Sequence, residues 1–365
     1  MMDIPALEAK DKFFKYIAKH PKIKGLHEEI ISIVKEQVGS PIVLVYGPTG
    51  VGKTTLLKLV AETLNQEMSA DTGSSGHIAV ARTEVISPSQ GNGIDWADFY
   101  HRLLADLKDP VLRPQGSLFP QTSFATITER RGETQLRRTL ENAIKFRRPK
   151  AILIDEAQHW CSVRSSWVLR KQLDILKSLA NCAEVPIILF GTYDLLAMRN
   201  LNGQLGRRCR EVHFPRYNPN DQEDMKTFCS LINTFVQAMP FENKPDLLSE
   251  VELIFLRTFG CTGTLKSWLD NAVSFALNQG HKELTKELFI NRAPSLETAH
   301  AIARETIYSE NAIKETPEMN RELREMLLTS KLPAADIPAP QRMLPIKKRR
   351  VGECKPQRRA CGGMS

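Results

Sequence analysis

The chain has 365 residues, of which 42% are hydrophobic and 25% are charged. This is the composition of an ordinary globular protein, and it excludes a collagen-like, low-complexity or wholly unfolded chain. At about 150 residues per domain, the length predicts about two domains. The seven cysteines are an odd number without C-x-x-C spacing, so we expect free thiols in a reducing compartment rather than a zinc ribbon.

The positive charge of the chain is concentrated near its C-terminal end. Residues 347–359 hold seven basic side chains and one acidic side chain, which accounts for most of the net charge of +8. Such a tail is a candidate contact for the phosphate backbone of a nucleic acid. The alternative is a solvated, disordered end that only aids solubility.

Secretion and membrane insertion are not indicated. The first residues include Asp3 and Glu8 and have no apolar segment of the kind found in signal peptides. The longest apolar runs, 42–46 and 187–190, are far too short to span a bilayer. We therefore expect a cytoplasmic protein.

Helices and strands alternate through the first part of the chain. Residues 6–38 are predicted to be helical, with a break at His20 and Pro21. Short apolar runs predict strands at 42–46, 78–86, 151–154, 187–190 and 212–214. Helical spacing predicts helices at 54–64, 94–107, 132–146 and 167–180. Composition predicts a loop at 87–93 and an irregular insertion at 108–131. This alternation favours an α/β domain with a parallel sheet.

From about residue 220 only helices are predicted. They are expected at 221–239, 247–259, 264–279, 282–292 and 295–305. Beyond residue 316 the chain becomes polar, and four prolines in 332–345 indicate a linker to the basic tail. The predicted organisation is a helical segment at 1–40, an α/β domain at 41–218, a helical domain at 219–315, and a Pro-rich linker with a basic tail at 316–365.

A glycine-rich motif follows the first predicted strand. Residues 47–54 match G-x-x-x-x-G-K-S/T at every fixed position, and a predicted helix follows them. The N–H groups of such a loop surround phosphates, so we expect Lys53 to reach the β- and γ-phosphates and Thr54 to hold Mg²⁺. The alternative is a tight glycine turn without a ligand. The expected nucleotide-binding residues are Gly47, Pro48, Thr49, Gly50, Val51, Gly52, Lys53, Thr54 and Thr55.

Two acids end the third predicted strand. Asp155 and Glu156 follow the apolar run Ile-Leu-Ile, which places them beside the glycine-rich loop if the sheet is parallel. We expect Asp155 to bind Mg²⁺ through its water shell and Glu156 to orient and polarise an attacking water. An acidic helix cap is the alternative. Glu156 favours a hydrolase over a small-molecule kinase.

Three further residues are candidates for contacts with the phosphates. Thr192 follows the fourth strand and is placed to touch the γ-phosphate or the water, unless it caps a helix. Arg208 precedes the fifth strand and is placed to reach the γ-phosphate of a neighbouring subunit, unless it is a surface arginine. Lys266 lies near the start of a predicted helix and is placed to contact the phosphates from the helical domain, unless it is merely exposed.

Four segments together resemble a known family. They are GPTGVGKTTL, AILIDEAQHW, IILFGTYDLL and GQLGRRCREVHFPRY. They resemble the AAA+ ATPases. The DEAQH string and the R-R-x-R…F-P-R-Y ending most resemble TnsC/TniB, the ATP-dependent regulators of Tn7-like and related DNA transposons. ORC/Cdc6-like and ExeA-like ATPases share parts of these strings. The resemblance covers about residues 20–310.

The resemblance implies a fold and a set of roles. The implied fold is an AAA+ P-loop α/β domain with a five-stranded parallel sheet and flanking helices, followed by a small all-helical lid and a disordered basic tail. The matching positions are Lys53 and Thr54 for Walker A, Asp155 and Glu156 for Walker B, Thr192 for sensor 1, Arg208 for the arginine finger and Lys266 for sensor 2. Threonine and lysine at the two sensors depart from the asparagine and arginine common in the family.

The resemblance also implies cofactors and partners. ATP and Mg²⁺ are the expected cofactors, and the protein is expected to form a ring or helical filament on duplex DNA without sequence preference. The implied partners are a TnsB/TnsAB-like transposase and a TniQ/TnsD-like target selector, in some systems an RNA-guided one. The implied location is the bacterial cytoplasm, with no membrane partner.

Arginines before the third strand are candidate DNA contacts. Arginines that line a pore would contact phosphates without distinguishing bases. The alternative is a solvated helix face. The candidates for DNA binding are Arg130, Arg131, Arg137 and Arg138, with Arg147 and Arg148 in the same stretch.

The sequence leaves three alternative functions. An ORC/Cdc6-like loader is expected to carry a winged-helix domain after the lid, and the Pro-rich, basic residues after 305 do not suit one. An ExeA-like ATPase is expected to carry a membrane segment. A scaffold that binds ATP but hardly hydrolyses it is the third alternative, and Glu156 argues against it.

Overall fold

The computed structural model describes residues 4–36, 42–69, 76–87, 94–108, 132–162, 166–200 and 209–330. Most of the predicted loop at 87–93, nearly all of the predicted insertion at 108–131 and the whole basic tail lie outside these residues. The described chain belongs to two compact units, residues 1–309 and 310–365.

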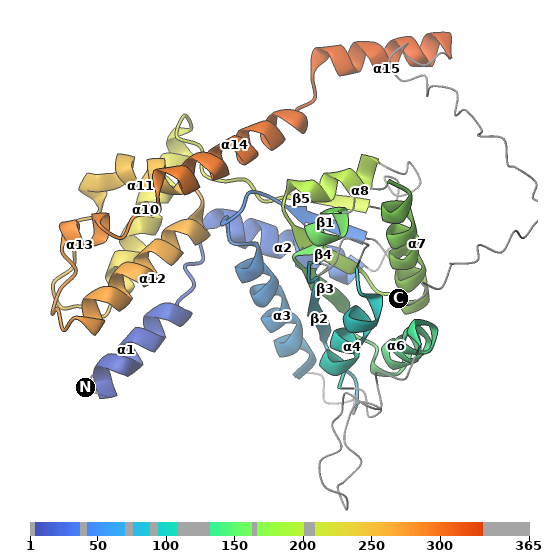
Figure 1. Ribbon diagram of the computed structural model, residues 1–365, viewed down its shortest axis with the longest axis horizontal. Coiled ribbons are helices and arrows are strands. Elements are labelled where there is room, and N and C mark those ends of the chain that lie inside the picture. Colours follow the sequence, from blue (N-terminus) through green and yellow to red (C-terminus); the bar gives the residue numbers. More distant parts are fainter. Residues whose placement is uncertain are drawn as a thin grey trace, which may run out of the picture. The chain divides into compact units, whose positions relative to one another are not determined.

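The described part of the first unit contains one parallel sheet of five strands (Figure 1). The strands are β1 (Ile42–Tyr46), β2 (Val80–Glu84), β3 (Ala151–Asp155), β4 (Ile187–Gly191) and β5 (Cys209–His213). Their order is β2-β3-β4-β1-β5. The predicted α/β class is confirmed, and β1 has the predicted bounds.

The fifth strand starts earlier than its apolar residues indicate. The prediction of 212–214 followed Val212 and Phe214, whereas β5 pairs with β1 from Cys209 to His213. Arg210 and Glu211 are exposed on this edge strand, so hydrophobic patterning did not reveal that they pair.

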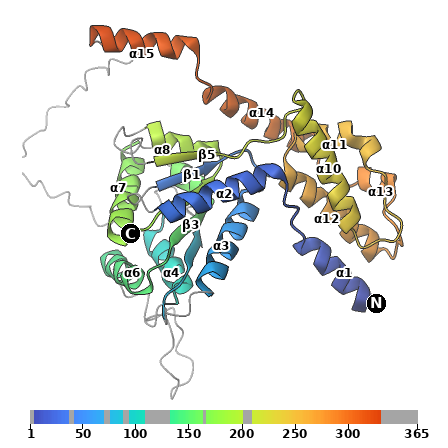
Figure 2. The same ribbon diagram turned by 180° about the vertical axis from the view of Figure 1, so that it is seen from behind.

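Helices cover both faces of the sheet (Figures 1 and 2). On one face lie α2 (Pro21–Glu36) and α3 (Lys53–Ser69), whose apolar side chains form one core with Val43, Val45 and Leu153. On the other face lie α4 (Trp96–Asp106), α6 (Glu133–Arg147) and α7 (Ser166–Ala183). Short helical turns follow β3 and β4, namely η2 (Ala157–Ser162), η3 (Tyr193–Leu195) and α8 (Leu196–Asn200).

A second core lies in the helical part of the first unit. The elements that follow β5 are α10 (Gln222–Ala238), η4 (Leu248–Glu250), α11 (Val251–Thr258), α12 (Thr262–Asn278), α13 (Lys286–Ile290) and α14 (Leu296–Ala312). Among them, α10, α11, α12 and α13 supply the buried side chains of this core. Trp268 stacks on Phe289 at 4.1 Å between ring centroids, and its indole N–H donates to the Phe289 carbonyl at 2.8 Å. The N-terminal helix α1 (Ile4–Lys15) adds Phe13 to this core. The two N-terminal helices therefore pack into different cores.

A helix that the polar composition did not predict lies beyond residue 316. It is α15 (Pro317–Thr329), in the second unit. Thr316 caps it by accepting a hydrogen bond from the Met319 N–H at 3.2 Å, and Pro317 occupies the first turn, where its missing N–H costs nothing. None of the described helices is both long and apolar enough to cross a membrane.

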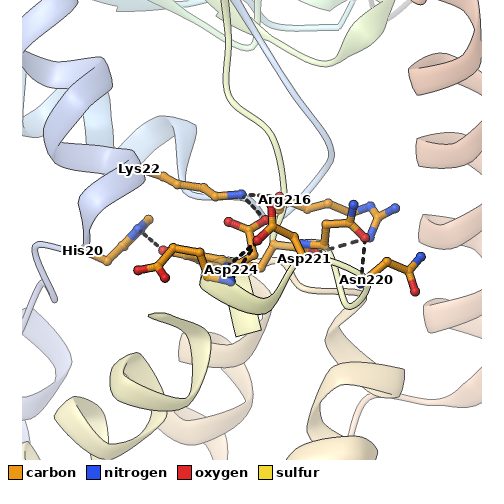
Figure 3. A network of polar contacts seen from close by, with 9 residues as sticks. His20, Lys22, Arg216, Asn220, Asp221 and Asp224 are labelled. Atoms are coloured by element: carbon orange, nitrogen blue, oxygen red, sulfur yellow. Dashed lines mark hydrogen bonds and ion pairs between the residues drawn. The ribbon is translucent and has the colours of Figure 1, made fainter. Parts of the chain in front are cut away.

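A polar network joins the α/β part to the helical part (Figure 3). Lys22, at the start of α2, forms an ion pair with Asp224 of α10 at 2.7 Å and donates to the Arg216 carbonyl at 2.8 Å. Asp224 also accepts from the Asn218 N–H at 2.8 Å. The ammonium of Lys22 lies 4.4 Å from the centroid of the Tyr217 ring. The segment after β5 is thus held between α2 and α10.

His20 is a buried titratable residue of this network. Its Nδ1 lies 2.8 Å from the Tyr217 hydroxyl, and only 7% of the residue is exposed. Burial, with a smaller contribution from the charge of Lys22, lowers the pKa of His20 from 6.5 to about 4. The folded protein therefore holds this imidazole neutral.

We predict that His20 makes the protein sensitive to acid. Between about pH 6.5 and 4 the unfolded chain protonates His20 while the folded chain does not, so stability falls as the pH falls. His20→Gln keeps a polar side chain that does not titrate. Between about pH 7 and 4, wild type should lose up to about 3 kcal/mol more unfolding free energy than this variant. Urea unfolding of both proteins across this range measures the difference, and parallel pH curves would contradict the prediction.

Candidate nucleotide-binding site

The parallel sheet brings the predicted site residues to one edge. β4 pairs with both β1 and β3, so the carboxyl ends of all three strands lie together. The glycine-rich loop follows β1, Asp155 ends β3, and Thr192 follows β4. The two halves of the predicted site therefore meet, as the sequence indicated.

The glycine-rich loop has a backbone that requires glycine at two positions. Gly50 and Gly52 have φ angles of +78° and +113°, in the region that other residues rarely occupy. The loop ends where α3 begins at Lys53. The N-terminus of a helix together with such a loop forms a cradle of N–H groups suited to an anion.

Lys53 is folded back onto this loop. Its ammonium donates to the carbonyls of Gly47 at 3.0 Å and Pro48 at 2.8 Å. Burial lowers the pKa of Lys53, and the nearby negative charges of Glu156, Asp155 and Glu305, together with Cys261, oppose this effect. A phosphate would replace the two carbonyls as the partner of this ammonium.

Thr54 and Asp155 supply oxygen atoms at one point. The Thr54 hydroxyl donates to Asp155 Oδ2 at 2.8 Å. Burial raises the pKa of Asp155, and the hydrogen bond from Thr54 opposes the rise. A hydroxyl and a carboxylate are the ligand types that Mg²⁺ uses together with phosphate oxygens. The residues present therefore fit the predicted cation.

Glu156 lies directly beyond this pair, on an unusual backbone. Its φ of +52° is in the left-handed region, which is uncommon for residues other than glycine and is often found at functional sites. The carboxylate accepts from the Gln158 amide at 2.5 Å and lies 3.9 Å from His159 Nε2. Gln158 lies within the DEAQH string, but the sequence assigned no role to its side chain.

Thr192 is held in place by a hydrogen bond from its backbone N–H. Its N–H donates to Gln158 Oε1 at 3.2 Å. Its hydroxyl is buried without a hydrogen-bond partner among the described residues. Although Thr192 precedes η3, its side chain makes no cap hydrogen bond, which argues against the helix-cap alternative.

The helical part reaches the glycine-rich loop through residues other than the one predicted. The Thr264 N–H donates to the Gly50 carbonyl at 3.0 Å, and the Thr262 hydroxyl donates to the Val51 carbonyl at 2.7 Å. Lys266 instead pairs with Asp270 at 2.5 Å, on the side of α12 that faces α1. A phosphate contact by Lys266 stays a prediction that would require this ion pair to open.

One acid of α14 also belongs to the surroundings of Lys53. Glu305 interacts electrostatically with Lys53 and Asp194. Burial, with a contribution from Asp194, raises the pKa of Glu305, and Lys53 opposes the rise. No motif in the sequence marks this residue, because its approach depends on where α14 packs.

The predicted arginines divide into three groups. Arg208, Arg130 and Arg131 lie outside the described residues. Arg137 is occupied within the fold, since it pairs with Glu141 at 3.0 Å and donates to the Ser178 hydroxyl. Arg147 likewise donates to the carbonyls of Gly76 and Lys108. Arg138 and Arg148 are exposed. DNA contact by any of these four arginines stays a prediction.

Residues 36–199 match the sequence model of the AAA domain. This part of the chain is therefore similar to an AAA domain. This match spans β1, β2, β3 and β4, together with the glycine-rich loop and both acids. No curated protein matches the chain.

Solved structures agree with this assignment of the fold. The ORC2 protein of Aeropyrum pernix, solved as ADPNP-ADP complexes, is 14% identical, with a TM-score of 0.52 over 80% of this chain and 72% of that chain. The ADP form of the same protein is also 14% identical, with a TM-score of 0.53 over 77% of this chain and 71% of that chain. At this identity the likeness concerns the fold, which is an AAA+ α/β fold.

Proposed function

We propose that this AAA+ protein binds ATP with Mg²⁺ at residues 47–54 and hydrolyses it. The observation that carries the proposal is the hydrogen bond between Thr54 and Asp155, which joins the glycine-rich loop to the acidic strand end at 2.8 Å. Two motifs about 100 residues apart thereby form one site. The ADPNP and ADP found in the similar ORC2 structures support a nucleotide as the ligand.

The roles of the residues follow from their positions. The loop N–H groups and Lys53 would hold the phosphates, while Thr54 and Asp155 would hold the cation. Mg²⁺ would neutralise charge on the phosphates. Glu156 would orient the attacking water, and Thr192, with its unpartnered hydroxyl, would contact the water or the γ-phosphate. Arg208 is proposed to complete the site from a neighbouring subunit.

We further propose that the protein assembles on duplex DNA and links a target selector to a transposase. The support is the resemblance of the DEAQH and F-P-R-Y segments to the TnsC/TniB regulators. Exposed Arg138 and Arg148 offer phosphate contacts without base specificity. Because the chain outside the tail carries little net charge, DNA affinity would come from weak contacts repeated along an oligomer.

A second candidate function is that of an ORC/Cdc6-like DNA-binding ATPase. The fold likeness to the ORC2 protein favours it. Both candidates use the same nucleotide site and bind DNA. They differ in partner, since only the first requires direct binding of a transposase.

We predict that Lys53 and Glu156 affect different steps. Lys53→Ala should abolish ATP binding, because it removes the charge that holds the phosphates. Glu156→Gln should still bind ATP but hydrolyse it slower by about 10²-fold or more, because the water loses its orienting carboxylate. Fluorescent-nucleotide binding and steady-state turnover measure the two effects.

Exposed residues of α3 provide the matched controls. Lys58→Ala and Glu62→Gln make the same chemical changes on the exposed surface of the helix and should leave binding and turnover unchanged. An equal loss of nucleotide affinity in the Lys53 and Glu156 variants would refute this division of roles.

We predict that DNA binding requires ATP, does not depend on the DNA sequence and weakens steeply as the salt concentration rises, since each neutralised phosphate releases counterions.

The basic tail is proposed to bind the transposase rather than DNA. Deletion of residues 347–365 should then leave the salt dependence unchanged and abolish transposase recruitment. A salt titration of full-length and truncated protein on one duplex tests this, and a clearly flatter slope after truncation would show that the tail lies on DNA.

A further inference from the structure

The side chain of Gln158 bridges two elements of the nucleotide-binding site. Its Nε2 donates to Glu156 Oε2 at 2.5 Å, and its Oε1 accepts from the Thr192 N–H at 3.2 Å. Glu156 follows β3 and Thr192 follows β4. A single amide therefore connects the carboxylate proposed to orient the water with the end of the neighbouring strand.

This bridge requires an amide. A carboxylate partner needs a donor and a backbone N–H needs an acceptor, and glutamine carries both on one planar group. The surroundings are shaped to admit it. A Cβ on Gly191 would lie 2.6 Å from Gln158 Oε1, so a larger residue at 191 would displace the amide.

Among the described residues, Gln158 is the one that forms a hydrogen bond with the Glu156 carboxylate. The Glu156 side chain is 47% exposed, and His159 Nε2 lies at 3.9 Å, beyond hydrogen-bond distance. Without Gln158 the carboxylate would be free to change rotamer in solvent. A catalytic group must be held close to its productive geometry by its neighbours to act efficiently.

We infer that Gln158 is a positioning residue for ATP hydrolysis, which holds the Glu156 carboxylate at the edge of the sheet where Thr192 lies. The inference rests on the proposed function, since it concerns the same site. Gln158 touches neither the nucleotide nor the reacting atoms in this role. It sets the direction of the group that orients the water.

The test compares wild type with Gln158→Met, which keeps the length of the side chain and removes both hydrogen bonds. Its kcat should fall roughly 10- to 100-fold, because small displacements of a catalytic group have effects of this size. KM and the affinity for fluorescent ATP should stay within about threefold, because Lys53 and Thr54 are untouched. Gln66→Met makes the same change at an exposed position of α3 and should leave kcat, KM and the affinity for fluorescent ATP unchanged.

Two further variants separate positioning from a general structural effect. Gln158→Glu keeps the acceptor for the Thr192 N–H but loses the donor to Glu156, so its kcat should fall as in Gln158→Met. In a Glu156→Gln background, Gln158→Met should cause no further loss, because it acts through the carboxylate already removed. A disturbed fold would instead lower nucleotide affinity and add to the loss.

The outcomes are distinguishable. A wild-type kcat in Gln158→Met or in Gln158→Glu, or losses that multiply in the double variant, would overturn the positioning role while leaving the ATPase proposal intact. A wild-type protein that binds ATP but shows no turnover with DNA present would overturn the proposed hydrolysis, and the role of Gln158 with it.

Discussion

The parallel pairing of β4 with both β1 and β3 brings the candidate site together. Three strands that run in the same direction end at the same edge, so the glycine-rich loop, Asp155 and Thr192 come together although they are far apart in sequence. The strands are buried between helices on both faces, which fixes their register. The register in turn fixes how far along the strand direction each of these residues lies. The Thr54–Asp155 hydrogen bond follows from this arrangement.

The helical part is tied to the same loop. Thr262 and Thr264, at the start of α12, donate to loop carbonyls, and the Lys22–Asp224 ion pair holds the connection between the two parts. A ligand that changes the loop backbone must therefore alter contacts with α12. This gives a direct physical route by which a bound nucleotide can influence the position of the helices, without any intermediate element.

Much of this site was predictable from sequence, for local reasons. The loop motif and the acid pair each follow an apolar run, and their roles depend on neighbours in the chain. Gln158 was not predictable, because its function arises from a strand that lies next to it only in the fold. The direction of the Lys266 side chain was not predictable from its position near the start of a helix. An ion pair with Asp270, one turn further along α12, holds the side chain toward α1. The capped helix α15 was not predicted because the polar composition after residue 316 indicated a linker, and its leucines, among them Leu323, are exposed in the structure.

Residues 47–54 and Asp155 are proposed to hold a nucleotide and its cation together. A structure determined with Mg²⁺ and a non-hydrolysable ATP analogue tests this proposal. We expect phosphates within the loop, the ammonium of Lys53 moved from the carbonyls of Gly47 and Pro48 to phosphate oxygens, and the cation between Thr54 and Asp155. Phosphates bound elsewhere, or Lys53 still bonded to those two carbonyls beside a bound nucleotide, would refute the proposal.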